Sequence, residues 1–262
     1  AAGNYPSYPP LNASSVSLLT TKNKDALPSD NGYPSSSTGR RTALADWLTH
    51  PEHPLTARVA VNHIWLRHFG TPLVASVTDF GLRAPEPRHQ ELLDHLSVEL
   101  IESGWDMKSL HQLILSSKTW QRSSSNLGVD QNTRILDESN QDYWRMNSRR
   151  MEAQVIRDSL LSMGEALDLT RGGPPVMASP DVRRRSLYYF HSRDNRSKFL
   201  NTFDDADVFG CYRRSETIVP QQALAMMNSP LATAAAKQIA TTFDTDLSRE
   251  KFVRTAFLAI LA

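Results

Sequence analysis

Apolar side chains recur at helical spacing along most of this chain, in segments that Pro or Gly interrupts. In one such segment Leu92, Leu96 and Leu100 share a stripe that Pro87 precedes and Gly104 follows, which is typical of an amphipathic helix with a marked start and stop. Comparable patterns predict further helices near residues 42–50, 54–69, 107–120, 151–163, 220–243 and 246–261. The sequence therefore predicts a mainly α, multi-helix globular domain.

One short segment has the composition of a β-strand. Residues 186–190 read Ser-Leu-Tyr-Tyr-Phe, and aromatic residues are common in strands. Residues 123–142 are rich in Ser, Asn, Asp and Gln, which predicts a loop. We expect a minor β strand or hairpin beside the helices.

Composition changes near residue 40. Residues 1–39 are rich in Pro and Ser and lack hydrophobic periodicity, so they are predicted to form an extended linker. Residues 40–262 are predicted to fold as a single helical domain, or as two packed subdomains over 40–122 and 143–262. The chain begins at Ala1 without a charged segment followed by an apolar one, so we expect any targeting signal to lie outside this sequence.

Composition and charge exclude several classes of protein. The chain has 40% hydrophobic residues and no apolar run approaching the roughly 18 that a membrane span requires, so we expect no membrane span. A net charge of +1 disfavours nucleic-acid binding, which requires many cations to neutralise phosphates. The single cysteine, Cys211, excludes an intrachain disulfide, a covalent haem motif and a cysteine-rich zinc site.

The histidines do not form an obvious metal motif. His63 and His68 are five residues apart and His89 and His95 six apart, so neither pair has the i, i+4 spacing of two ligands on one helical face. We therefore predict no metal site and no cofactor bound by this chain.

The densest charged cluster precedes and enters the predicted helix at 151–163. Its members are Arg145, Arg149, Arg150, Glu152, Arg157 and Asp158. On one interpretation they form a lattice of ion pairs, such as Arg149 or Arg150 with Glu152. On the other, several guanidinium groups on one face form a clamp for an anionic ligand.

A second cluster lies in the long connector 191–219, where loops on a helical scaffold often carry function. Neighbouring guanidinium groups would favour the thiolate of Cys211, and Asp204 would supply an acid. The candidate ligand-binding residues are Arg149, Arg150, Arg157, Asp204, Cys211, Arg213, Arg214 and Thr217. The structural alternative is that Arg213 and Arg214 pair with Asp204, Asp205 or Asp207.

Short motifs occur in a fixed order along the chain, in segments 39–48, 53–62, 68–70, 79–81, 91–94, 103–106, 147–153, 172–174 and 214–224. Together they resemble one protein family, the planctomycete-type domain of unknown function 1553. The resemblance covers roughly residues 39–262, and motifs in a fixed order are far more specific than any single one. It implies no settled activity and no catalytic residues.

The resemblance also implies a context. Such domains lie at the C-terminal end of secreted multidomain chains, after a cytochrome-c-like region, so we expect an extracytoplasmic location, upstream domains of the same polypeptide as partners, and a haem only in such an upstream domain. The first hypothesis for function is an accessory or substrate-binding module of a larger cytochrome-linked protein, with a possible anionic carbohydrate ligand. The alternative is a carbohydrate-active or redox enzyme domain acting on an anionic extracellular polymer.

Overall fold

A computed structural model describes residues 40–80, 84–210, 214–242 and 248–261. The predicted linker 1–39 lies outside these residues, as do Cys211 and Arg213. The chain divides between Arg149 and Arg150 into two compact units. Each unit has its own packing and is described separately.

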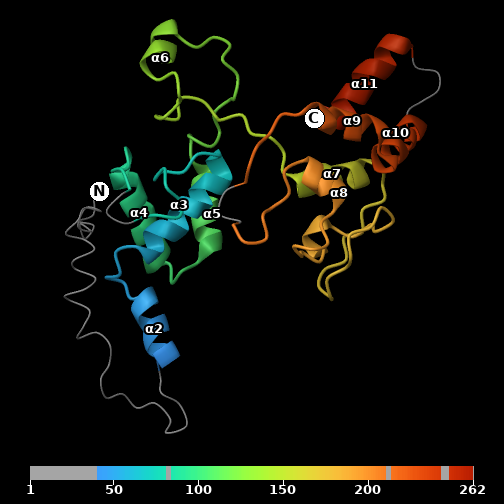
Figure 1. Ribbon diagram of the computed structural model, residues 1–262. Coiled ribbons are helices and arrows are strands. Elements are labelled where there is room, and N and C mark those ends of the chain that lie inside the picture. The colour runs from blue at the N-terminus through green and yellow to red at the C-terminus, as the bar shows by residue number, and fades with distance from the viewer. Residues whose placement is uncertain (1–39, 81–83, 211–213, 243–247, 262) are drawn as a thin grey trace. The chain divides into compact units, whose positions relative to one another are not determined.

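The predicted mainly α fold is confirmed, because helices are the dominant element throughout the described residues (Figure 1). The first unit contains α2 (Arg40–Thr49), α3 (Thr56–Phe69), α4 (Gln90–Glu102), α5 (Met107–Ser116) and α6 (Gln131–Leu136). The second contains α7 (Ala153–Met163), the short 3₁₀ helix η1 (Ser186–Tyr188), α8 (Lys198–Thr202), α9 (Pro220–Asn228), α10 (Pro230–Thr242) and α11 (Arg249–Leu261).

The core of the first unit lies where α3, α4 and α5 meet. Val61 and Phe69 of α3 and Leu93 of α4 are almost fully buried in one apolar cluster, as the helical stripes predict. Gly70 ends α3 in the left-handed conformation, with φ of 76°, which Gly adopts at little cost. The apolar stripes therefore define both the helices and their buried faces.

Two buried polar side chains connect α3 to its neighbours. Arg58 is 1% exposed, and its Nε donates to Asp94 Oδ1 on α4 at 2.6 Å. Asn62 is fully buried and pairs with both backbone groups of Val74: Nδ2 donates to the carbonyl at 3.1 Å and Oδ1 accepts from the N–H at 2.9 Å. These bonds satisfy polar groups that would be costly to bury alone.

The segment predicted as a loop at 123–142 contains a helix, α6, so that part of the prediction is wrong. Asp130 caps this helix by accepting from the backbone N–H groups of Asn132 and Thr133 at 3.1 and 3.3 Å, a common way to satisfy the first turn. No residue of α6 is buried. An exposed helix lacks the apolar stripe that reveals helices in a sequence.

The second unit packs around α7. Ala153 of this helix forms a small core with Tyr189, Leu200 and Phe203. The helix α10 also packs against α7, and at Gly164, directly after α7, a Cβ atom would lie 3.3 Å from the backbone of Ala235 on α10. The second unit is thus organised by a single helix and its neighbours.

Two local predictions for residues 149–190 are wrong. Residues 186–190 form the 3₁₀ turn η1 and one isolated bridge between Val176 and Tyr189, because within the described residues no strand lies alongside to continue the pairing. Arg149, Arg150 and Glu152 do not lie on a helix, since α7 begins at Ala153. Helical spacing therefore does not apply to their predicted pairing.

Candidate functional site

The predicted site residue Arg149 belongs to the first unit. Its side chain packs over Gly70, where an added Cβ would lie 2.7 Å from Arg149 Cδ, and its Nη1 donates to the backbone carbonyl of Arg67. The carbonyls near a helix C-terminus attract cations. Arg149 therefore helps to end α3.

Arg157 is a buried structural residue of α7. It is 4% exposed, and its guanidinium donates to the carbonyls of Val182 and Arg184 and to Ser186 Oγ. It also lies over the ring of Tyr189, 4.5 Å from the centroid. With its donors directed at the protein, Arg157 fixes the segment 182–189 to α7.

Arg157 has a carboxylate beside it that extends the same network. Asp158 Oδ1 accepts from Arg157 Nη1 at 3.1 Å and from Ser186 Oγ at 2.6 Å, and the Ser186 N–H donates to both carboxylate oxygens. These additional hydrogen bonds to the carboxylate offset the cost of removing the ion pair from water.

The structure brings Arg150, Asp204 and Thr217 together. The backbone N–H and the hydroxyl of Thr217 donate to Asp204 at 2.7 and 2.8 Å, and Arg150 Nη1 lies 3.8 Å from the same carboxylate. Gln222, which sequence reasoning missed, closes the group: its Oε1 accepts from Arg150 Nη2 at 2.8 Å and its Nε2 donates to the Thr217 carbonyl at 3.1 Å. An amide can join a cation to a carbonyl in this way because it both accepts and donates.

Arg214 contacts side chains at the start of α7. Its Nη1 donates to Gln154 Oε1 at 2.6 Å, and its Nη2 lies 3.2 Å from Glu152. Gln154 in turn donates to Asp205 Oδ1 at 2.6 Å, and His191 Nε2 lies 3.8 Å from the same oxygen. The predicted pairing of Arg214 with an aspartate is thus replaced by contacts with Glu152 and Gln154.

Asp207 has a local role. Its carboxylate accepts from the backbone N–H groups of Phe209 at 2.7 Å and Gly210 at 2.9 Å, and these two bonds hold the pKa of Asp207 below its usual value. Such bonds stabilise a turn. Cys211 and Arg213 lie outside the described residues.

In chemical terms, the described members of the predicted site form internal hydrogen-bond networks. The guanidinium groups of Arg150, Arg157 and Arg214 each donate to protein acceptors. This geometry favours the interpretation that these arginines form a lattice of internal contacts over the interpretation that they clamp an anionic ligand. Binding at these residues stays a prediction.

For metal ions, no group of three or more His, Cys, Asp or Glu side chains lies close enough together within the described residues to hold one. His68 Nε2 and His111 Nδ1 lie 2.7 Å apart, so one ring nitrogen donates to the other. Burial, the His111 ring and Arg149 all lower the pKa of His68.

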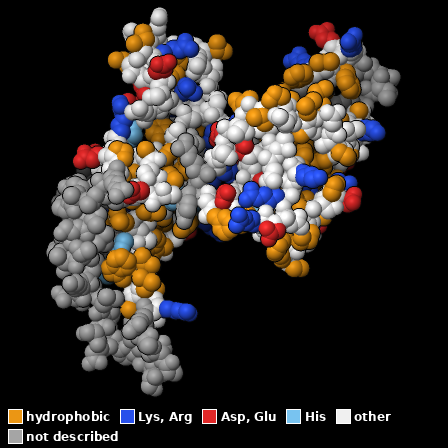
Figure 2. All heavy atoms as spheres, viewed as in Figure 1, with side chains coloured by type: hydrophobic (Ala, Val, Ile, Leu, Met, Phe, Trp, Pro, Cys, Tyr) orange, Lys and Arg blue, Asp and Glu red, His pale blue; other side chains and the backbone are white. Residues whose placement is uncertain are grey.

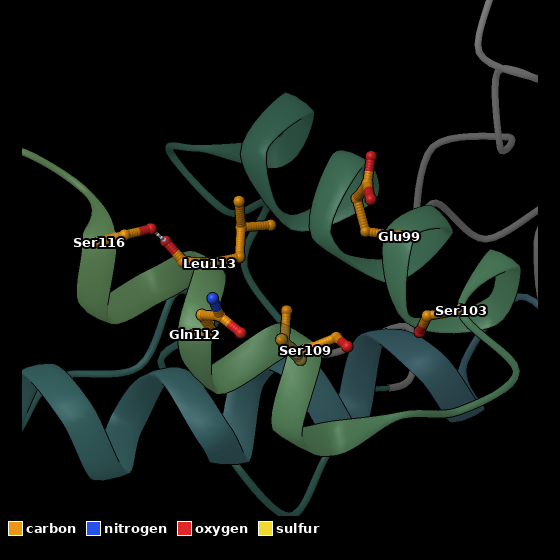
Figure 3. Close-up of a pocket in the computed structure, with 7 residues that line it drawn as sticks. Glu99, Ser103, Ser109, Gln112, Leu113 and Ser116 are labelled. Carbon is orange, nitrogen blue, oxygen red and sulfur yellow. Dashed lines mark hydrogen bonds between the residues drawn. The ribbon is translucent and has the colours of Figure 1, made fainter.

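A groove between α4 and α5 is lined by three serines and by Leu110 and Leu113 (Figure 3). The hydroxyls of Ser103, Ser109 and Ser116 donate to Leu100, Asp106 and Leu113. Glu99 and Gln112 also line the groove. Because its hydroxyl protons are committed to the protein, the groove offers a ligand few donors.

A second hollow lies beside α6, with a volume of about 570 Å³. We call it the α6 hollow, and its lining residues are Asn126, Gln131, Arg134, Ile135, Glu138, Trp144 and Arg145. Sequence reasoning placed Arg145 in an Arg-rich cluster but missed the others. Asp130, a helix-capping residue within a polar stretch, is the signal that would have revealed the helix forming one wall.

Comparison with known proteins gives one result. The family model described as PSD1, a protein of unknown function (DUF1553), matches residues 40–262. No curated protein and no solved structure matches the chain. Among the described residues, no helix is long and apolar enough to cross a membrane.

Proposed function

The chain belongs to the DUF1553 family, and on that basis we propose that it is an accessory, substrate-binding module of a larger extracytoplasmic protein. In this proposal the chain holds no cofactor itself, and any haem belongs to an upstream domain of the same polypeptide. The single observation that supports a module of this kind is the exposed apolar face of α11.

That face consists of two parallel rows of side chains. Phe252, Ala256 and Ile260 form one row at i, i+4 spacing, and Val253, Phe257 and Leu261 form the other. None of the described residues of α11 is buried; Phe257 is 61% and Leu261 73% exposed. In Figure 2, apolar side chains gather over the C-terminal helices.

An exposed apolar face of this kind favours a docking role. A helix of 13 residues is marginally stable in water by itself, and amphipathic helices gain most of their stability by burying the apolar face. Apolar patches left on a protein surface commonly mark interaction sites. We propose that an upstream domain of the same polypeptide covers α11.

Hydrogen–deuterium exchange tests the docking. We expect the amides of α11 to exchange rapidly in this chain alone and slowly in the longer polypeptide that contains it, because docking suppresses local opening. Phe257→Ser is expected to restore fast exchange in the longer polypeptide. Lys251→Ser, at an exposed position of the same helix, is the matched control and is expected to leave exchange slow.

Two outcomes would contradict the proposal. One is equal protection of α11 in both polypeptides. The other is protection of α11 in this chain that rises with its concentration, which would assign the face to a second copy. The extracytoplasmic location is tested separately by fractionating the source cells and detecting the protein with an antibody, where recovery in the cytoplasmic fraction would contradict it.

A further inference from the structure

We propose that the α6 hollow binds an acidic saccharide, with Arg134 and Arg145 holding its carboxylate or sulfate group. This inference deepens the proposed role in substrate binding, and it rests on that role but not on the docking of α11. It concerns residues of the first unit alone.

The floor of the hollow is fixed before any ligand arrives. Asn140 is 2% exposed and holds the backbone of Arg145 by two bonds: its Nδ2 donates to the carbonyl at 2.9 Å and its Oδ1 accepts from the N–H at 3.1 Å. The indole N–H of Trp144 donates to the Asp137 carbonyl at 2.8 Å, and Arg122 donates to the Trp144 carbonyl at 3.0 Å. Such anchoring reduces the entropy that binding must remove.

Short bonds stabilise α6, which supplies several residues of the lining. Asp130 caps the start of the helix. After its end, the carboxylate of Asp137 accepts from the backbone N–H groups of Gln141 and Asp142 at 2.8 and 2.7 Å. Arg134 and Gln131, which line the hollow, therefore lie on a helix that side-chain to backbone bonds stabilise at its start and just after its end.

The N–H donors of the two guanidinium groups are available to a ligand. Within the part of the chain that the structure describes, neither Arg134 nor Arg145 makes a side-chain hydrogen bond or ion pair. Arg145 lies against the Trp144 ring, 5.1 Å from its centroid, and its buried Nε has no partner among those residues. Unlike Arg150, Arg157 and Arg214, these two arginines keep their donors for a ligand, and guanidinium forks match the oxygens of carboxylate and sulfate.

The rest of the lining fits a sugar ring. Asn126 and Gln131 supply amides and Glu138 a carboxylate, groups that can bond hydroxyls, while Trp144 and Ile135 supply apolar contact. A volume of about 570 Å³ lies within the range of roughly 300–1,000 Å³ typical of small-ligand sites. The lining has two cations, Arg134 and Arg145, and one acid, Glu138. This charge suits a ligand with a single anionic group per ring rather than a polyphosphate chain.

Isothermal titration calorimetry with three trisaccharides of equal length tests the inference. The probes are a uronic acid trisaccharide, its neutral methyl ester, and a sulfate-ester trisaccharide. We expect the carboxylate or the sulfate form to bind, and the methyl ester to bind at least about tenfold more weakly because it lacks the charge. Comparing the affinities of the two acidic probes shows whether the site prefers a carboxylate or a sulfate ester.

Three variants locate the binding. Arg134→Gln and Arg145→Met are each expected to weaken binding by about tenfold or more. Lys118→Gln removes the same charge from an exposed position of the same unit outside the hollow, and it is expected to leave the affinity within about twofold of the parent, as screened distant charges contribute little. Circular dichroism confirms folding of each variant, and Arg134→Gln, on an exposed helix, keeps the test valid if Arg145→Met misfolds.

The inference is overturned if neither acidic probe binds at millimolar concentration. It is equally overturned if the methyl ester binds as tightly as the acid, or if Arg134→Gln and Lys118→Gln weaken binding to the same extent. The exchange of α11 is measured on different polypeptides, so failure here and failure of the docking are distinguishable.

Discussion

Thr217 donates both its backbone N–H and its hydroxyl to the carboxylate of Asp204, at 2.7 and 2.8 Å. The two residues are 13 positions apart, and Asp204 itself adopts the left-handed conformation, with φ of 59°. A non-glycine residue in this region is strained unless its contacts hold it there. The carboxylate therefore joins the segment just after α8 to the segment just before α9.

Removing that carboxylate is expected to destabilise the second unit. We predict that Asp204→Ala lowers the free energy of unfolding by about 1–3 kcal/mol, because charged acceptors contribute more than neutral ones. Urea denaturation measures the change. Asp194→Ala, in the exposed loop at 191–197, is the control, and an equal loss in both variants would contradict the assigned role.

Arg157 is expected to be the most sensitive position of the predicted set. Arg157→Met would leave the carbonyls of Val182 and Arg184 without this donor and would remove the cation beside Asp158, and breaking a buried pair costs about 3–5 kcal/mol. We expect a large drop in the urea midpoint, while Arg185→Met, which alters an exposed side chain, causes little change. A near-neutral Arg157→Met would show that its hydrogen bonds contribute little net stability.

Stability and ligand binding are expected to separate in the double variant Arg150→Ala with Arg214→Ala. Both residues hold neighbouring segments of the second unit, so we predict a lower melting temperature. Affinity for the acidic trisaccharide is expected to stay unchanged, since the α6 hollow lies in the first unit. Loss of binding in a variant that stays folded would restore these residues as the ligand site.

The first unit is expected to lose stability as the pH falls below about 6.5, the ordinary pKa of histidine. The pKa of His68 is lowered in the folded protein, so the unfolded state binds more protons in this window, and stability rises with pH through it. We predict a lower urea midpoint at pH 5 than at pH 7.5. His68→Gln is expected to reduce this dependence, and the pH effect would have another source if it persisted in full.

Helices with an apolar stripe were predictable, and short polar ones were not. The stripe Leu92, Leu96 and Leu100 identified α4, because burial of one face leaves a periodic trace in the sequence. The exposed α6 leaves no such trace. Residues 186–190 have strand composition, but a strand also requires a partner that composition does not specify.

Part of the candidate site was also predictable from the sequence, and part was not. Sequence clustering brought together Arg150, Asp204 and Thr217, which the structure places in contact. It did not reveal that Arg157 points inward, although Arg157 shares its helical face with the buried Ala153 and Leu160, a position from which that orientation follows. Arg134 and Arg145 are 11 positions apart, and only the fold of the intervening segment brings them to one hollow.

The bond between Asn62 and Val74 has a consequence for chemical ageing. The Asn62 amide imitates a peptide group, since it offers one donor and one acceptor to the backbone of Val74. Deamidation would replace the donor with a second acceptor facing a carbonyl oxygen in a site without access to water. Because the site is buried, no water can replace the amide nitrogen of Asn62. A molecule deamidated at Asn62 would be expected to release residues 70–80 from α3.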